Sequence, residues 1–247
     1  MKDKFLKVIV PLAFWLALWA IAAAVVGKEL ILPAPAAVGR SLCALVVTSD
    51  FWRSALTSLL RVLAGFLMGT AGGVVLAAAT AASVWADRLF SPALRAVRTV
   101  PVVSFILLLF FSLPNTKVPA AVSALMALPV VWRAARQGLA SADPLLLEMA
   151  SAYRFSRWKT IRLIYIPAAL PALAAGCETA LGLAWKSGMA AEVLCQPKWA
   201  AGSRLQSAKA YLDTPGLIAW TVVIVALSLA MEGLLRLLFR RWRGAKM

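Results

Sequence analysis

The chain has 247 residues, 62% of them hydrophobic, and a mean hydropathy of +0.85. This composition excludes an ordinary soluble protein and indicates an all-α, polytopic membrane protein. The net charge of +16 would suggest nucleic-acid binding in a soluble chain, but the basic residues lie mainly between apolar segments and at both ends, so nucleic acid is not expected. Because the chain has no histidine, a histidine proton relay and the usual zinc sites are excluded, and neither a metal nor a cofactor is expected.

The first apolar segment, residues 5–26, follows Lys2 and Lys4. A cleaved signal peptide is the alternative, but the length of the run favours a retained span that enters from the cytoplasm. Pro33 and Pro35 then break the helix. Residues 36–50 have the mixed character of an amphipathic helix at the outer membrane surface.

Small residues recur at every fourth position in the second span, residues 55–81, and in the fifth, residues 168–192. In lipid, this spacing lets another helix backbone approach closely, so both stripes predict helix packing. No Gly-Lys-Ser/Thr follows the first stripe, so it is not a phosphate loop. The two stripes consist of Gly65, Gly69, Gly73, Ala77 and Ala81, and of Ala172, Gly176, Ala180, Ala184 and Gly188.

The remaining spans are expected at residues 101–113, 118–139 and 216–238. Six spans in a single transmembrane domain, 1–247, place both termini and most of the 26 Lys and Arg residues in the cytoplasm, as the positive-inside rule requires.

The three cysteines do not have metal-ligand spacing. Cys177 lies within an apolar segment, so a Cys43–Cys195 disulfide on the outer side is conceivable, while three unpaired thiols are favoured.

Charged residues enter the fifth span at Glu178, Lys186 and Glu192. Counting about 1.5 Å per residue from Pro167 places Glu178 near mid-bilayer and Lys186 near the outer interface. Lys186 and Glu192 can snorkel to that interface, and Arg61 in the second span is expected to act only as such an anchor. Glu178 is too deep and too short to do so, and we expect it to be protonated, paired or in contact with water.

The polar loop at residues 140–166 connects spans four and five. A helix should begin after Pro144 with Glu148 near its start, where an acid is favourable. Ala150 and Ala152 are expected to keep a flat surface for a partner. A turn follows at about Arg154, and a second short helix leads to Pro167 at the start of the next helix. A basic loop that serves only membrane topology is the alternative.

This loop resembles the signature of the permease subunits of binding-protein-dependent ABC importers. That signature is Glu-Ala-Ala, a glycine after three more residues, and Ile-x-Leu-Pro after nine. Glu148, Ala150, Ile164 and Pro167 match it with the spacing intact. Met149 and Ile166 are mild substitutions, and Arg154 stands where the family has glycine. The Leu-Pro-x-Pro at 32–35 and the run AWKSGMAAEVL are similar to permeases of the nitrate, sulfonate and taurine type. Residues 101–113 lack the second proline, the tryptophan and the glycine of the family's corresponding segment.

The resemblance implies the fold of a type I importer permease in a bacterial inner membrane. It implies a homodimer, or a pair with a paralogue, that takes a small solute from an outer binding protein and is driven by two cytoplasmic ABC ATPase subunits. The coupling residues would be Glu148, Ala150, Arg154, Ile164 and Pro167. The pathway residues would come from span five, namely Glu178, Trp185, Lys186 and Glu192.

The resemblance implies a solute such as a sulfonate, another small organic anion, nitrate or a vitamin precursor. The chain has no Walker motif and no nucleophile–base pair, so it is not expected to be an enzyme, and ATP hydrolysis is assigned to separate subunits. The alternative is a stand-alone secondary transporter that uses Glu178 as an ion or proton site. The lack of a convincing internal repeat argues against it.

Overall fold

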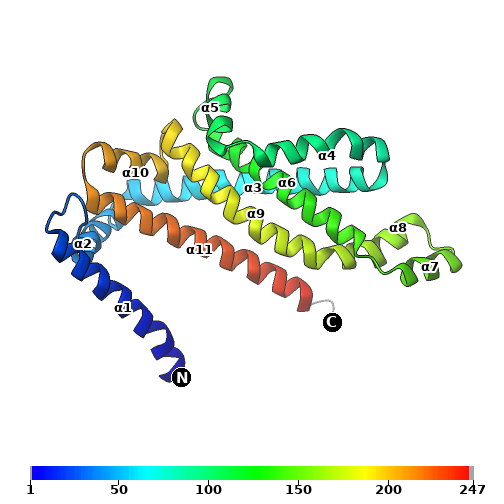
Figure 1. Cartoon of the computed structure of the whole chain (residues 1–247), viewed down its shortest axis with the longest axis horizontal. Coiled ribbons are helices and arrows are strands. Elements are labelled where there is room, and N and C mark those ends of the chain that lie inside the picture. Colours follow the sequence, from blue (N-terminus) through cyan, green and yellow to red (C-terminus); the bar gives the residue numbers. More distant parts are fainter. Residues whose placement is uncertain (1, 245–247) are drawn as a thin grey trace. The chain divides into compact units, whose positions relative to one another are not determined.

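The computed structural model describes the backbone of residues 2–244 and the side chains of residues 10–239, and all regular structure in this range is helical (Figure 1). The chain divides into two compact units, Met1–Ser58 with Lys198–Leu227, and Leu59–Pro197 with Ser228–Met247. The helices are α1 (Lys2–Val26), α2 (Pro35–Val46), α3 (Ser49–Ala82), α4 (Val84–Thr99), α5 (Val102–Ser112), α6 (Val118–Ala140), α7 (Pro144–Ala152), α8 (Arg157–Thr160), a π-helical segment η1 (Ile161–Tyr165), α9 (Ile166–Cys195), α10 (Ala201–Ala210) and α11 (Thr214–Gly244).

The first unit has a small core of its own, in which Phe51 of α3 packs on Trp220 of α11 with ring centroids 5.2 Å apart. The Ser58 hydroxyl accepts a hydrogen bond of 2.8 Å from the backbone N–H of Ala201, which fixes α10 to α3. The helix predicted after Pro33 is α2. Pro35 occupies its first turn, because the fixed φ of proline suits the start of a helix.

The second unit is held together by close helix contacts. Gly65, Gly69 and Gly73 of α3 are buried, and a Cβ at any of them would collide with α6 at Ala120, Ala124 or Leu128. The stripe of α9 is buried too, at Gly176, Ala180, Ala184 and Gly188, and α9 packs along α6 (Figure 1). The glycines of α3 and the stripe residues of α9 from Gly176 to Gly188 thus lie at contacts within the same chain, whereas Ala81 of the first stripe is exposed.

Four helical stretches in the described range are long and apolar enough to cross a membrane: Ser49–Ala82, Val118–Ala140, Arg157–Cys195 and Thr214–Phe239. These contain four of the predicted spans, and α1 coincides with a fifth. The segment expected as the third span, residues 101–113, is helical as α5 but does not form a simple crossing by itself, so the third crossing stays a prediction. The segment forms only the 11-residue α5, which bends by 105° from α4 across Pro101, whereas a crossing needs about 20 residues.

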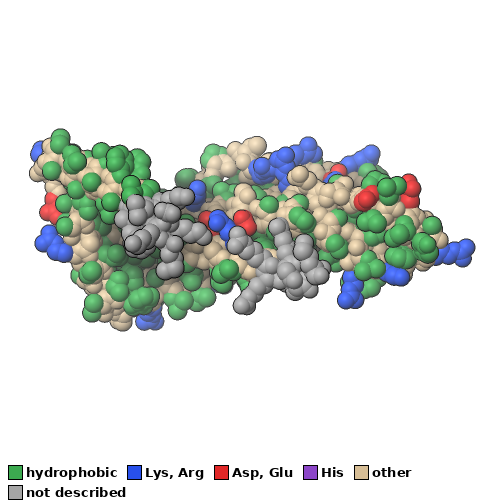
Figure 2. All heavy atoms as spheres, turned by 90° about the horizontal axis from the view of Figure 1, so that it is seen from below, with side chains coloured by type: hydrophobic (Ala, Val, Ile, Leu, Met, Phe, Trp, Pro, Cys, Tyr) green, Lys and Arg blue, Asp and Glu red, His purple; other side chains and the backbone are tan. Residues whose placement is uncertain are grey.

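Hydrophobic side chains cover much of the face shown in Figure 2. Leu67, Met68 and Val75 of α3 are exposed, as are Leu107, Leu108 and Phe111 of α5. Exposed apolar helix surface of this extent is expected where lipid or another membrane subunit replaces water.

Candidate functional site

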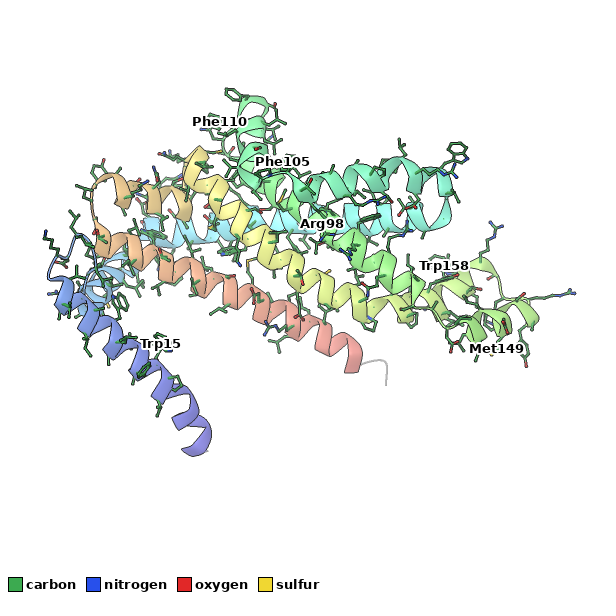
Figure 3. All side chains as sticks on the ribbon, viewed as in Figure 1. Trp15, Arg98, Phe105, Phe110, Met149 and Trp158 are labelled. Carbon is green, nitrogen blue, oxygen red and sulfur yellow. The ribbon has the colours of Figure 1, made fainter. Side chains whose placement is uncertain are left out.

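The loop between α6 and α9 folds into α7 and α8. The Asp143 carboxylate caps α7 by accepting a hydrogen bond of 2.9 Å from the Leu145 N–H, and Pro144 occupies the first turn. Ser156 caps α8 in the same way, accepting from the Lys159 N–H at 3.3 Å. Figure 3 shows Met149 on α7 and Trp158 on α8, at the end of the α6–α9 pair. The predicted helix after Pro144 is confirmed.

The turn between these helices lies at Arg154, as expected. Its φ of 51° is in the left-handed region, where a residue with a Cβ is strained by about 1–2 kcal/mol and glycine is not. The Phe155 N–H closes the end of α7 on the Ala150 carbonyl at 2.8 Å. The backbone at position 154 thus has the conformation that suits glycine, the residue found here in the permease signature. In this chain the position is occupied by arginine.

We therefore expect Arg154→Gly to stabilise the protein by about 1 kcal/mol, which raises its melting temperature by roughly 2–4 °C. Arg157→Gly is the control, because Arg157 is also exposed and starts a regular helix, where glycine costs stability. Melting in detergent checks both variants. A melting temperature for Arg154→Gly equal to or below that of wild type would show that the turn is not strained.

Beyond Ser156 the chain runs without a break into the membrane-length helix. Just before Pro167, the Ile166 N–H donates a hydrogen bond to the Ile161 carbonyl five residues earlier, which is the π-helical pattern. Pro167 itself has no N–H to donate. The second short helix expected before Pro167 is therefore the first part of a 39-residue helical stretch, Arg157–Cys195. Helices α8 and α9 are therefore parts of one helical stretch, joined by the π-helical segment η1.

Ala150 and Ile164 face inward, with exposed fractions of 3% and 5%, whereas Glu148 and Arg154 are exposed. Ala150 therefore cannot present a flat surface to a partner, and that interpretation is wrong; its small size fits the interior. The exposed residues of α7 include Glu148 and the apolar Leu145, Leu146 and Met149, and Ala152 is exposed as expected.

Glu192 on α9 is completely buried, and its Oε1 lies 3.4 Å from Nη1 of Arg61 on α3. A buried carboxylate requires such a partner, because removal of its charge from water costs several kcal/mol. The expectation that both residues snorkel to the interface is therefore wrong. The sequence placed each charge near a helix end but held no signal that two positions 131 residues apart would meet.

Glu178 is paired, which was one of its three expected states. Its Oε2 lies 3.7 Å from Nε of Arg236 on α11, and Arg236 also bonds Glu232 at 3.4 Å. The Glu178 side chain is still 41% exposed. Sequence reasoning had assigned no role to Arg236 or Glu232, although their four-residue spacing is that of a helical ion pair.

The other two residues assigned to the pathway from the sequence differ in burial. Trp185 is 3% exposed and lies in the interior, whereas Lys186 is exposed. Cys43, Cys177 and Cys195 are all free thiols, so the conceivable Cys43–Cys195 disulfide is absent.

Several helices of bilayer length with exposed apolar side chains define a multi-pass membrane protein. Residues 69–244 match the family described as "Binding-protein-dependent transport system inner membrane component", and the chain belongs to that family.

Two relatives illustrate the match. The riboflavin transport system permease protein RibX of Chloroflexus aurantiacus is 26% identical over 220 residues, which is 87% of this chain and 81% of the relative. The taurine transport system permease protein TauC of Escherichia coli K12 is 25% identical over 236 residues, 92% of this chain and 85% of the relative.

A solved structure shares the fold. "Crystal structure of an amino acid ABC transporter with histidines" superposes with a TM-score of 0.68 at 18% identity, covering 81% of this chain and 97% of the matched chain. The chain is thus a multi-pass ABC importer permease with the type I permease fold.

Proposed function

We propose that α7 and α8 receive a cytoplasmic ABC ATPase, and that two copies of the chain form the pathway for a solute delivered by a binding protein. The observation that supports this most is the exposed acid on α7, one turn at Arg154 away from a helix that continues into the membrane. Closure of two ATPases would move α8 and α9 together as a rigid body. In the proposed topology of six spans both termini are cytoplasmic.

The substrate is proposed to be a small organic anion such as a sulfonate, or a heterocyclic vitamin. The relatives transport taurine in one case and riboflavin in the other, as their names state. Lys186 would attract an anion if its exposed side chain faces the pathway.

Uptake into vesicles that contain the permease, its ATPase and the binding protein tests the transport mode. We expect uptake to require ATP and to persist when an ionophore collapses the proton gradient. Uptake that follows the gradient and ignores ATP would contradict the proposal and support a secondary transporter.

Glu178 and Lys186 are the proposed pathway residues, while Trp185 and Glu192 would shape the wall from behind. An exposed ion pair facing lipid would be costly, so we infer that Glu178 and Arg236 face water in the pathway. Because this pair is not buried, it should contribute at most about 1 kcal/mol to stability.

We therefore expect Glu178→Gln to change the uptake rate while the melting temperature falls by no more than roughly 4 °C. Glu232→Gln is the matched control, since it removes the other carboxylate from Arg236 and should leave uptake unchanged. Wild-type uptake by Glu178→Gln together with a large drop in melting temperature would make Glu178 a packing residue only.

A further inference from the structure

A basic pocket of about 440 Å³ lies between α4 and α6, and its lining includes no residue of α7 or α9. One face of α4 supplies Asp87, Ser91, Arg95 and Arg98, which recur at helical spacing. The facing helix α6 contributes the remaining wall, and Figure 3 shows Arg98 where the two helices approach each other. The residues from α6 are Trp132, Arg133 and Arg136.

Two of the four arginines are held in place. Arg136 donates from Nη1 to the Asp87 carboxylate and to the Thr80 carbonyl, the latter at 3.0 Å. Arg95 donates from Nε to the Ser91 carbonyl at 3.2 Å. The hydrogen bond from Ser91 and then the one from Arg136 lower the pKa of the Asp87 carboxyl, which lies outside the proposed spans, so Asp87 stays ionised.

The other two arginines have no such partner. Within the described residues, neither Arg98 nor Arg133 makes a hydrogen bond or an ion pair, and both are exposed. One carboxylate thus faces four guanidinium groups. The planar fork of a guanidinium matches the oxygens of a phosphate group, so the excess charge favours a phosphate-bearing ligand.

The other side chains of helix α4, outside the pocket lining, favour a lipid over a free phosphate. Val84, Trp85 and Leu89 of the same helix α4 are exposed at 67%, 79% and 69%. Tryptophan and aliphatic side chains beside arginines are typical of a helix that lies at the headgroup level of a bilayer. The proposed topology places this helix on the cytoplasmic side, where basic pockets between helices bind anionic headgroups.

We propose that the α4–α6 pocket binds the phosphodiester headgroup of an anionic phospholipid, with Arg98 and Arg133 on the phosphate.

Native mass spectrometry of the full-length protein in detergent tests the site, with phosphatidylglycerol, phosphatidylcholine and inorganic phosphate as probes. We expect phosphatidylglycerol to bind at least tenfold more tightly than phosphatidylcholine. Removal of both charges in Arg98→Gln/Arg133→Gln should weaken phosphatidylglycerol binding roughly 30-fold, since each basic residue near an anionic surface contributes about a factor of five. Lys28→Gln/Arg40→Gln removes the same charge from exposed positions elsewhere and should bind like wild type.

Several outcomes would overturn the proposal. An unchanged affinity of the double variant for phosphatidylglycerol would show that Arg98 and Arg133 do not bind the lipid. Competition by inorganic phosphate at a concentration equal to that of the lipid would indicate a site for a free anion. Loss of ATPase association with unchanged lipid affinity would instead indicate a protein-docking surface. If the double variant does not fold, the single variants Arg98→Gln and Arg133→Gln should each weaken binding about fivefold, and unchanged binding by both would count against the site.

Discussion

Gly69→Leu is expected to destabilise the protein by about 3 kcal/mol or more, which lowers its melting temperature by roughly 6–12 °C. At this position a Cβ alone would already overlap the Ala124 carbonyl of α6 and lie 2.9 Å from the Ala127 Cβ. Backbone atoms cannot move aside as a side-chain end can, so α3 and α6 must separate. Melting in detergent, followed by the yield of monodisperse protein, measures the effect.

Gly233→Leu is the control for this prediction. Gly233 also lies within a long helix, α11, but a Cβ there meets nothing within 4 Å. This variant should melt at or above the wild-type temperature, because leucine is a better helix former than glycine. An equal drop for both variants would mean that leucine in a helix, rather than the α3–α6 contact, causes the loss.

Glu148→Lys is expected to reduce ATP-dependent uptake at least tenfold while the protein still inserts and melts normally. Glu148 is exposed on α7 and makes no ion pair among the described residues, so the change disturbs no internal contact. A charge reversal within a docking surface weakens the free energy of binding by several kcal/mol, because it adds repulsion and removes a contact. Uptake and co-purification of the ATPase are the two readouts.

Glu29→Lys makes the same charge change at an exposed residue between α1 and α2 and should transport normally. Undiminished co-purification of the ATPase with Glu148→Lys, together with normal uptake, would remove Glu148 from the coupling surface.

Local patterns in the sequence predicted much of this fold. The four-residue spacing of Gly65, Gly69 and Gly73 identified a packed helix face, because in lipid only small residues allow that approach. The turn at Arg154 followed from the spacing of the signature around it.

Long-range geometry was not predictable in the same way. The Arg61–Glu192 and Glu178–Arg236 pairs depend on which helices become neighbours, and helical periodicity does not contain that information. The bend of 105° between α4 and α5 was not predicted, because hydropathy does not show a change of direction. Ala150 was misplaced because small residues suit a buried position as well as a flat exposed one.

Photo-crosslinking tests the docking of an ATPase on α7 most directly. A photoreactive amino acid replaces Leu145, which is 71% exposed on α7, in membranes that contain the assembled transporter. We expect an adduct with the ATPase subunit, and none when the same group replaces Tyr211, which is 85% exposed and follows α10 on the proposed outer side. An adduct at position 145 with lipid alone, in complexes that hydrolyse ATP normally, would contradict docking on α7.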